Sequence, residues 1–186
     1  MFIQTEATPN PQTLKFIPGV EVLTSGTADF RDEEAAKRSP LAEALFGIAD
    51  VRGVFFGSDF VTVTKSSDVE WNLVKPAILT TIMEHFVAGR PIMYEAKDKK
   101  IRKNSTAHSE DSEIVKQIKE LIDTRVRPAV AEDGGDIIFQ SFEDGVVRLE
   151  LHGSCSGCPS STATLKQGIE SMLCHYVPEV KSVEAV

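Results

Sequence analysis

Two cysteines, Cys155 and Cys158, are the residues of this chain whose type and spacing could support metal or redox chemistry. A strand-like run precedes them and a helix-like run begins at Pro159, so we expect them in a loop at a helix N-terminus. Unpaired N–H groups and the helix dipole stabilise negative charge there, which predicts thiols more acidic than free cysteine. Gly157 lets the backbone turn back so that both sulfurs can face one point. A thiolate both binds metals and attacks disulfides, so acidity does not decide between these chemistries.

The number of donors limits what one chain can hold. Iron–sulfur clusters and structural zinc generally take four protein ligands, and the loop supplies two. The third cysteine, Cys174, lies on the predicted helix 16 residues after Cys158, and therefore about 24 Å from it. At about 100° per residue it also points away from the face of Leu165 and Ile169, as a surface thiol would. A four-thiolate site thus requires two chains, each giving Cys155 and Cys158 across a two-fold axis. Such an interface site is open to an acceptor protein, which suits a cluster that is handed on.

The composition argues against several other classes of function. The 186 residues carry 20 Lys and Arg against 28 Asp and Glu, a net charge of −8, which disfavours nucleic acids and anionic membranes as partners. No apolar run approaches the ~20 residues that span a membrane, and no secretory signal is visible. Three cysteines, an odd number, without such a signal favour a reducing compartment over a disulfide framework. No phosphate loop, catalytic triad or paired-carboxylate motif supports an enzyme.

Residues 1–95 are predicted to form one α+β domain that does not contain the cysteine pair. Its expected strands are 2–5, 13–17, 51–56 and 60–65, and its expected helices are 41–48 and 73–87. Ser39 followed by Pro40 is a typical helix start, and Pro76 is expected in the first turn of the second helix. Within 60–65, valines alternate with Thr62 and Thr64, the pattern of a half-buried strand. Phe55 is expected in the core of this domain.

Residues 96–111 are predicted to be a flexible charged linker, because they offer almost no apolar side chains to bury. Residues 112–186 are predicted to form a second domain with the order α-β-β-α-β. Its strands are expected at 137–142 and 146–152, joined by a tight turn, and at 180–186, with the second helix at 159–176. The fold class is therefore α+β, with two small two-layer α/β domains.

Three polar features of the second domain carry further expectations. Pro128 is expected to close or kink the first helix. The segment 132–136 is expected to be a turn in which Gly134 and Gly135 both take positive φ. His152 lies on the polar face of its strand, so it is expected to be solvated rather than a further ligand.

Several blocks of this chain resemble a known family. The stretch 153–161, preceded by 132–136 and followed by 165–170 and 177–180, is similar to the C-terminal domain of the NifU-like (Nfu) family. The N-terminal half resembles the accompanying domain of the two-domain members. The matching blocks there are Met1–Thr5, Thr8–Pro11, Leu14–Gly19, Arg38–Ala42, Val54–Gly57 and Trp71–Leu73. The resemblance covers nearly the whole chain except the linker.

This resemblance implies a scaffold or carrier, not an enzyme. It implies a [4Fe-4S] cluster bound by Cys155 and Cys158 of two protomers, which therefore form a homodimer around it. The implied partners are upstream cluster assembly proteins and apo iron–sulfur recipients, with no nucleic acid and no membrane. In the family, the N-terminal domain has no cluster ligands and is associated with partner recognition. Cys174 belongs to none of the matched motifs.

Two other uses of the cysteine pair stay open at this point. Zinc accepts the same four thiolates, so a zinc-bridged dimer is one alternative. A thiol–disulfide redox protein is the other, although its loop usually carries proline between the cysteines, whereas Pro159 follows them here. The expected compartment is the bacterial cytoplasm, with the mitochondrial matrix as the alternative if the chain is a mature form.

Overall fold

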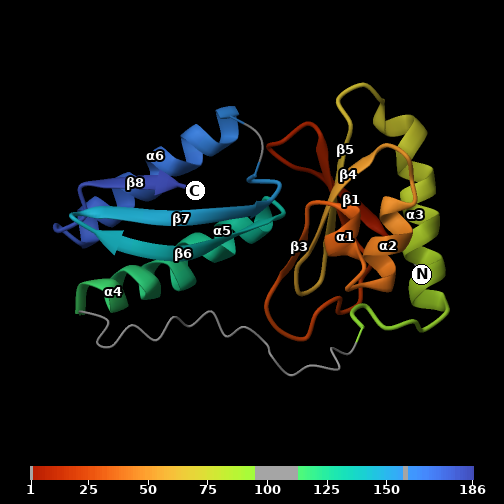
Figure 1. The fold of residues 1–186 in the computed structure, drawn as a ribbon, viewed down its shortest axis with the longest axis horizontal. Helices are drawn as coiled ribbons and strands as arrows, with labels where there is room; N and C mark the ends of the chain where they lie inside the picture. The colour runs from red at the N-terminus through yellow and green to blue at the C-terminus, as the bar shows by residue number, and fades with distance from the viewer. Residues whose placement is uncertain (1, 95–112, 157–158) are drawn as a thin grey trace.

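The structure, a computed structural model, describes residues 2–94, 113–156 and 159–186. Two α+β domains lie side by side, each with its own sheet and its own cluster of buried apolar residues (Figure 1). The predicted fold class is confirmed. The predicted linker, 96–111, lies outside the described residues. Within the described part of the chain, no helix is long and apolar enough to cross a membrane.

The N-terminal domain is built on an antiparallel sheet with the strand order β1-β2-β5-β4-β3. Its strands are β1 (Gln4–Ala7), β2 (Thr13–Ile17), β3 (Ala28–Phe30), β4 (Val51–Phe56) and β5 (Val61–Lys65). The helices are α1 (Glu33–Ala36), α2 (Pro40–Phe46) and α3 (Trp71–Val87), and they lie on the side of the sheet away from the second domain (Figure 1). The sequence pattern missed β3 and α1, which are too short to show a period.

Local sequence signals explain where the helices begin. The Ser39 hydroxyl accepts the Ala42 N–H at 3.1 Å, so the predicted cap before Pro40 is confirmed. Helix α3 begins at Trp71, two residues before the expected start, and Pro76 therefore lies inside the helix rather than in its first turn. That position leaves one carbonyl of the first turns without its helical donor.

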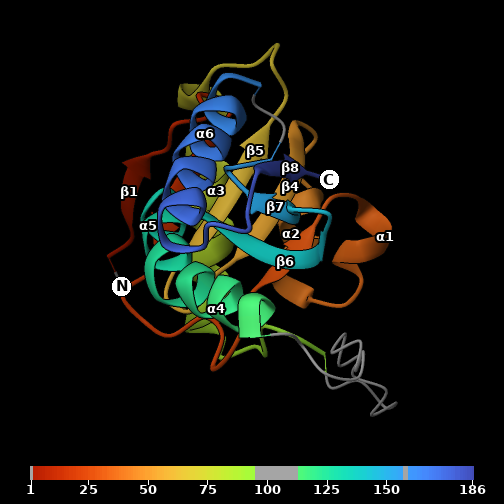
Figure 2. The same ribbon diagram turned by 90° about the vertical axis from the view of Figure 1, so that its left-hand side faces the viewer.

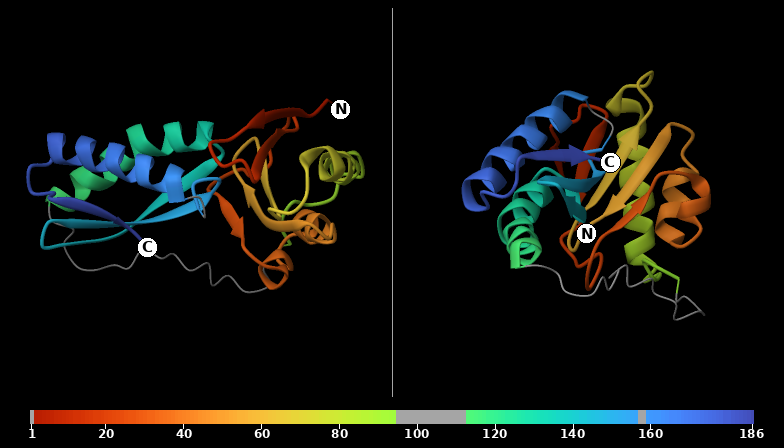
Figure 3. Two further views of the ribbon diagram at one scale, coloured as in Figure 1. Left: turned by 90° about the horizontal axis from the view of Figure 1, so that it is seen from above. Right: turned by 60° about the vertical axis from the view of Figure 1, so that its left-hand side comes forward.

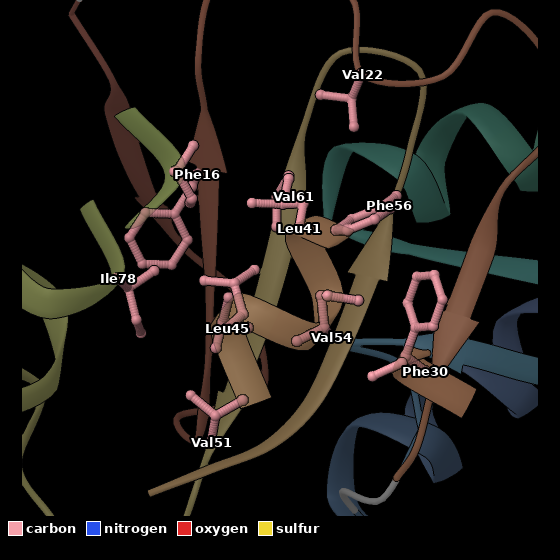
Figure 4. Close-up of a cluster of buried hydrophobic side chains, with 14 of the residues drawn as sticks. Phe16, Val22, Phe30, Leu41, Leu45, Val51, Val54, Phe56, Val61 and Ile78 are labelled. Carbon is pink, nitrogen blue, oxygen red and sulfur yellow. The ribbon is translucent and has the colours of Figure 1, made fainter. Parts of the chain in front are cut away.

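The two faces of the N-terminal sheet bury different kinds of residue. Alternate side chains of the strands, among them Phe16, Val54, Phe56 and Val61, face the helices. They form the apolar core shown in Figure 4 together with Leu41 and Leu45 of α2 and Ile78 of α3. The residues between them point to the opposite face. Lys15, Thr62, Phe55 and Asp29 are direct cross-strand neighbours there, on β2, β5, β4 and β3 respectively. We call these four residues the docking row.

The C-terminal domain has the predicted α-β-β-α-β order. Its elements are α4 (Glu113–Leu121), a π-helical turn (Ile122–Val126), α5 (Arg127–Glu132), β6 (Gly135–Glu143), β7 (Val146–Gly153), α6 (Pro159–Tyr176) and β8 (Ser182–Ala185). Strand β7 is central, antiparallel to β6 and parallel to β8. The helices pack on one face of this sheet (Figures 2 and 3).

Two turns set the geometry of this domain. Asp144 and Gly145 take φ of 53° and 86°, so the predicted hairpin turn between β6 and β7 is confirmed. Pro128 does not close the first helix, since α5 continues through it. A wide turn precedes Pro128, in which the Arg127 N–H donates to the Ile122 carbonyl. Of the two glycines expected at positive φ, only Gly134 has it, at 79°.

Candidate functional site

Cys155 follows the end of β7 and is 6% exposed. Its carbonyl accepts the Thr162 hydroxyl of α6 at 3.1 Å. The preceding residue, Ser154, is also held in place. Its N–H donates to the Gly134 carbonyl at 3.2 Å, and its hydroxyl donates to the Asp133 carbonyl. The loop is therefore tied to both α6 and the turn before β6. Cys158 lies outside the described residues.

The start of β6 approaches the Cys155 sulfur very closely. A Cβ atom built on Gly135 would lie 2.7 Å from Cys155 Sγ and 2.7 Å from the His152 carbonyl oxygen. No side chain fits there without displacing the cysteine or the end of β7, so this position requires glycine. The segment 132–136 was expected only to form a turn, and its contact with the sulfur was missed because a glycine gives no side-chain signal.

The surroundings of Cys155 stabilise its protonated form. Burial raises the pKa of the Cys155 thiol to about 11, the nearby carboxylates of Asp133 and Asp136 act in the same direction, and a contact with the Ser154 hydroxyl partly opposes them. The expectation of an acidic thiol is therefore wrong for Cys155 in this conformation, because burial outweighs the helix terminus. Binding a metal here releases the thiol proton.

A buried ion pair anchors β6 directly after Gly135. Asp136 is 3% exposed, and Arg127 of α5 holds it with two bonds of 2.9 Å, from Nε and from Nη2. Asp136 also accepts the Ile137 N–H at 2.8 Å and the Thr27 hydroxyl of the other domain at 2.7 Å. Burial alone would raise the pKa of the Asp136 carboxyl, but these bonds outweigh it and hold that pKa below its ordinary value. This carboxylate thus stays charged and fixes the strand beside the sulfur.

The N-terminal domain packs against both segments that flank Cys155. His152 is not solvated as expected, because its Nδ1 lies 3.1 Å from Asp29 and its side chain is 14% exposed. Arg31 reaches Glu150 at 3.3 Å and the Leu151 carbonyl at 3.4 Å. Burial would raise the pKa of Asp29, but bonds from His152 and Arg31 lower it overall. Charged groups of both domains therefore meet along β7.

The other members of the docking row reach the turn and the end of β7. Lys15 Nζ donates to the carbonyls of Ala131 and Glu132 at 3.2 and 3.1 Å, at the C-terminus of α5. A Cβ atom built on Gly134 would lie 2.7 Å from a Thr62 methyl, and one built on Gly153 would lie 3.1 Å from the Phe55 ring. Phe55 is therefore buried against the second domain, not in the core of its own as expected. Period-two alternation placed these residues on the second face but did not say what covers it.

Cys174 does not lie free on a helix surface. Its side chain is partly buried against the C-terminal core, and its thiol donates to the Val180 carbonyl at 3.1 Å. The expected outward orientation is wrong because the chain after α6 folds back over this side of the helix to begin β8. Over the described ranges, no group of three or more His, Cys, Asp or Glu residues could hold a metal ion. In those ranges the cysteine at the loop is a single thiol donor.

Comparisons with known proteins identify both domains. Residues 3–89 match the family model described as "Scaffold protein Nfu/NifU N terminal", and residues 118–184 match the "NifU-like domain". Cys155 and Cys158 both fall within the second match.

Full-length relatives extend the similarity over the whole chain. Proteins named "NFU1 iron-sulfur cluster scaffold homolog, mitochondrial" from Drosophila willistoni and Homo sapiens are each 54% identical to it over 187 aligned residues. The alignments cover 100% of this chain, but only 64% of the fly protein and 72% of the human one. Among solved structures, the solution NMR structure of a NifU-like protein from Saccharomyces cerevisiae is 27% identical, with 52% of this chain and 87% of that chain covered and a TM-score of 0.47.

Proposed function

This chain belongs to the Nfu family of NifU-like scaffold proteins, and we propose that it carries a [4Fe-4S] cluster between two protomers and transfers it to apo-proteins. Cys155 and Cys158 of each protomer are the proposed ligands. The cluster is cargo, so the protein is proposed to be a carrier and not an enzyme. The relatives' names, which call them iron–sulfur cluster scaffold homologs, support this reading.

The observation that carries the proposal is the position of Cys155. It lies at the end of β7 in the NifU-like domain, with Gly135 leaving room for its sulfur and Ser154 tying the loop to the neighbouring turn. A thiolate is a soft ligand suited to iron–sulfur clusters and zinc. Because a cluster generally takes four such ligands, the two cysteines of one loop leave half of the site to a second chain.

The proposed partners follow from the cargo. Upstream assembly proteins supply the cluster, and apo iron–sulfur proteins receive it. The relatives are named as mitochondrial proteins, which supports the mitochondrial matrix rather than the bacterial cytoplasm that we expected from the sequence. Cell fractionation of the tagged host protein tests this compartment.

Anaerobic reconstitution with iron and sulfide tests the function. The wild-type chain is expected to turn brown and to form a dimer with one cluster per two chains, seen by absorption spectroscopy and native mass spectrometry. Cys155→Ser and Cys158→Ser are each expected to lose the cluster and the dimer. Cys174→Ser is the matched control, because it removes a thiol that binds a carbonyl within the C-terminal domain, and it is expected to load normally.

Three results would contradict the proposal. A monomer that keeps all its iron would show that one chain completes the site. A colourless dimer containing zinc after purification and reconstitution would favour the zinc-bridged alternative. Disulfide reductase activity without iron, lost in Cys155→Ser, would favour the redox alternative.

A further inference from the structure

We infer that the N-terminal domain is a built-in cover for the edge of the C-terminal domain that carries Cys155. In the chain without cluster, the docking row binds this edge, and a second chain reaches the sulfur only after the N-terminal domain has moved away. The inference rests on the proposed function, because it concerns how the shared site becomes accessible.

The docking row is one continuous feature of the N-terminal sheet. Its four members, Lys15, Thr62, Phe55 and Asp29, are consecutive cross-strand partners on the face opposite the helices. Thr62 is 1% and Phe55 2% exposed, although neither belongs to the apolar core of its own domain. The C-terminal domain lies against this face in Figure 1 and in the left view of Figure 3. The face is therefore an interface between the two domains, and it loses its covering when they separate.

Polar and charged contacts cross this interface beside the buried ring of Phe55. The carbonyls of Ala131 and Glu132 accept from Lys15, and a carboxyl of Asp136 accepts from Thr27. At β7 Arg31 reaches Glu150 and the Leu151 carbonyl, and Asp29 contacts His152. Interfaces between domains of one chain that are polar rather than apolar permit relative motion, because water can replace the lost bonds. The contacts are specific enough to hold the domain in place and replaceable enough to release it.

The cover touches the segments that enclose the sulfur. Gly135 lies against the Cys155 sulfur, and the residues before and after it in the sequence both contact the N-terminal domain. Gly134 lies against Thr62, and Asp136 binds Thr27. At the end of β7, Gly153 meets Phe55 two residues before the cysteine. The docked domain therefore braces both strands beside a thiol that is 6% exposed.

Docking and cluster sharing place opposite demands on this edge. A cluster bridged by two chains requires the cysteines of both chains to bind iron atoms of the same cluster, so the two cysteine loops have to come close together. A second C-terminal domain then has to occupy space beside β6 and β7 next to Cys155. The docked N-terminal domain already lies against those strands. The protein is therefore closed while empty and open when it shares a cluster.

The test compares two variants of the full chain that lose the same charge. Lys15→Met with Arg31→Ala removes donors that cross the interface. Lys37→Met with Arg52→Ala is the control, because among the described residues these cations bind groups of their own domain alone. Small-angle scattering of the cluster-free chain is expected to give a larger radius of gyration for the first variant only.

Accessibility is then measured with and without a cluster. With Cys158→Ser and Cys174→Ser added to both variants, the remaining thiol, Cys155, is expected to react roughly tenfold faster with a disulfide reagent in the interface variant, the factor for one hydrogen bond to a charged group. With all cysteines present, the interface variant is also expected to form the cluster-linked dimer faster. A second pair of variants, Gly134→Ala and its control Gly89→Ala, changes no charge. Both glycines have positive φ, but only the methyl at position 134 meets a residue of the other domain.

The outcomes separate the cover from the proposed function. Equal compactness, or equal Cys155 reactivity, in the interface and control variants would overturn the cover. Faster thiol reaction without faster dimer formation would overturn its role in controlling cluster binding. A wild-type chain that takes up no cluster would refute the proposed function, while scattering and thiol reactivity would still decide whether the N-terminal domain covers this edge.

Discussion

Replacing Arg127 by methionine is expected to destabilise the C-terminal domain by leaving a buried carboxylate without its cation. Asp136 is 3% exposed and receives both Arg127 bonds at 2.9 Å. Breaking a fully buried pair costs about 3–5 kcal/mol. The Arg127 side chain is 39% exposed, so water screens part of the interaction, and we expect a loss of about 2 kcal/mol.

The pH dependence of this loss identifies its cause. In the wild type the pKa of Asp136 lies below its ordinary value, so the pair contributes stability above the unfolded pKa of about 3.9 and loses it as the pH falls further. Without Arg127, burial raises that pKa, and the folded variant takes up a proton more readily than the unfolded chain. The difference between wild type and variant is therefore expected to shrink as the pH falls from neutral to about 5.

Amide hydrogen exchange in β6 and β7 measures this loss in the C-terminal domain alone. Exchange by opening of the whole domain is expected to be about 30-fold faster in Arg127→Met. Arg127→Met combined with Asp136→Asn removes the unpaired charge and is expected to recover about 1 kcal/mol. A loss below about 0.5 kcal/mol, the same at both pH values, would refute the reasoning, and so would a double variant no more stable than the single one.

Two further predictions concern the cysteine site and a buried histidine. Gly135→Ala is expected to abolish cluster uptake, because its methyl meets the Cys155 sulfur at 2.7 Å. The control Gly168→Ala has open space around its methyl, so it is expected to load normally and to gain about 1 kcal/mol of helix stability. Iron content measures the loading, and thermal unfolding measures the stability. His85 is 2% exposed and burial lowers its pKa, so the unfolded chain binds its proton first and the N-terminal domain is expected to lose stability as the pH falls below about 6.5. His85→Gln is expected to flatten that fall in urea titrations followed by tryptophan fluorescence, and exposed His175→Gln is not; equal slopes would show that the proton binds elsewhere.

Patterns within a few residues predicted most of the elements of this fold. The Ser39 cap and the Asp144 turn each depend on neighbours in the sequence, and each lies where it was expected. The alternation located β5, but the strand is not half-buried as expected, because Thr62 on its second face is also buried. The position of Cys155 between a strand and a helix was predicted in the same way. Such signals are visible because their physics is local.

The parts that the sequence did not predict depend on residues far apart in the chain. His152 was expected in water because its strand gave no information about Asp29, 123 positions away. Phe55 was expected in the core of its own domain for the same reason, since alternation shows which residues share a face but not that a second domain covers that face. The acidity expected for Cys155 failed because burial, a property of the assembled domain, outweighs the helix terminus that the sequence reveals.

The wide turn at Ile122–Val126 sets the direction in which the residues after it point. Its bond from the Arg127 N–H back to the Ile122 carbonyl spans one residue more than a regular helical bond does. If the same residues formed an unbroken α-helix, everything after the turn would be rotated by about 100° relative to α4. Arg127 would then leave Asp136. Asp123, Thr124 and Arg125 are exposed and can vary in type, but the wide turn itself is required to direct Arg127 to the carboxylate beside the cysteine.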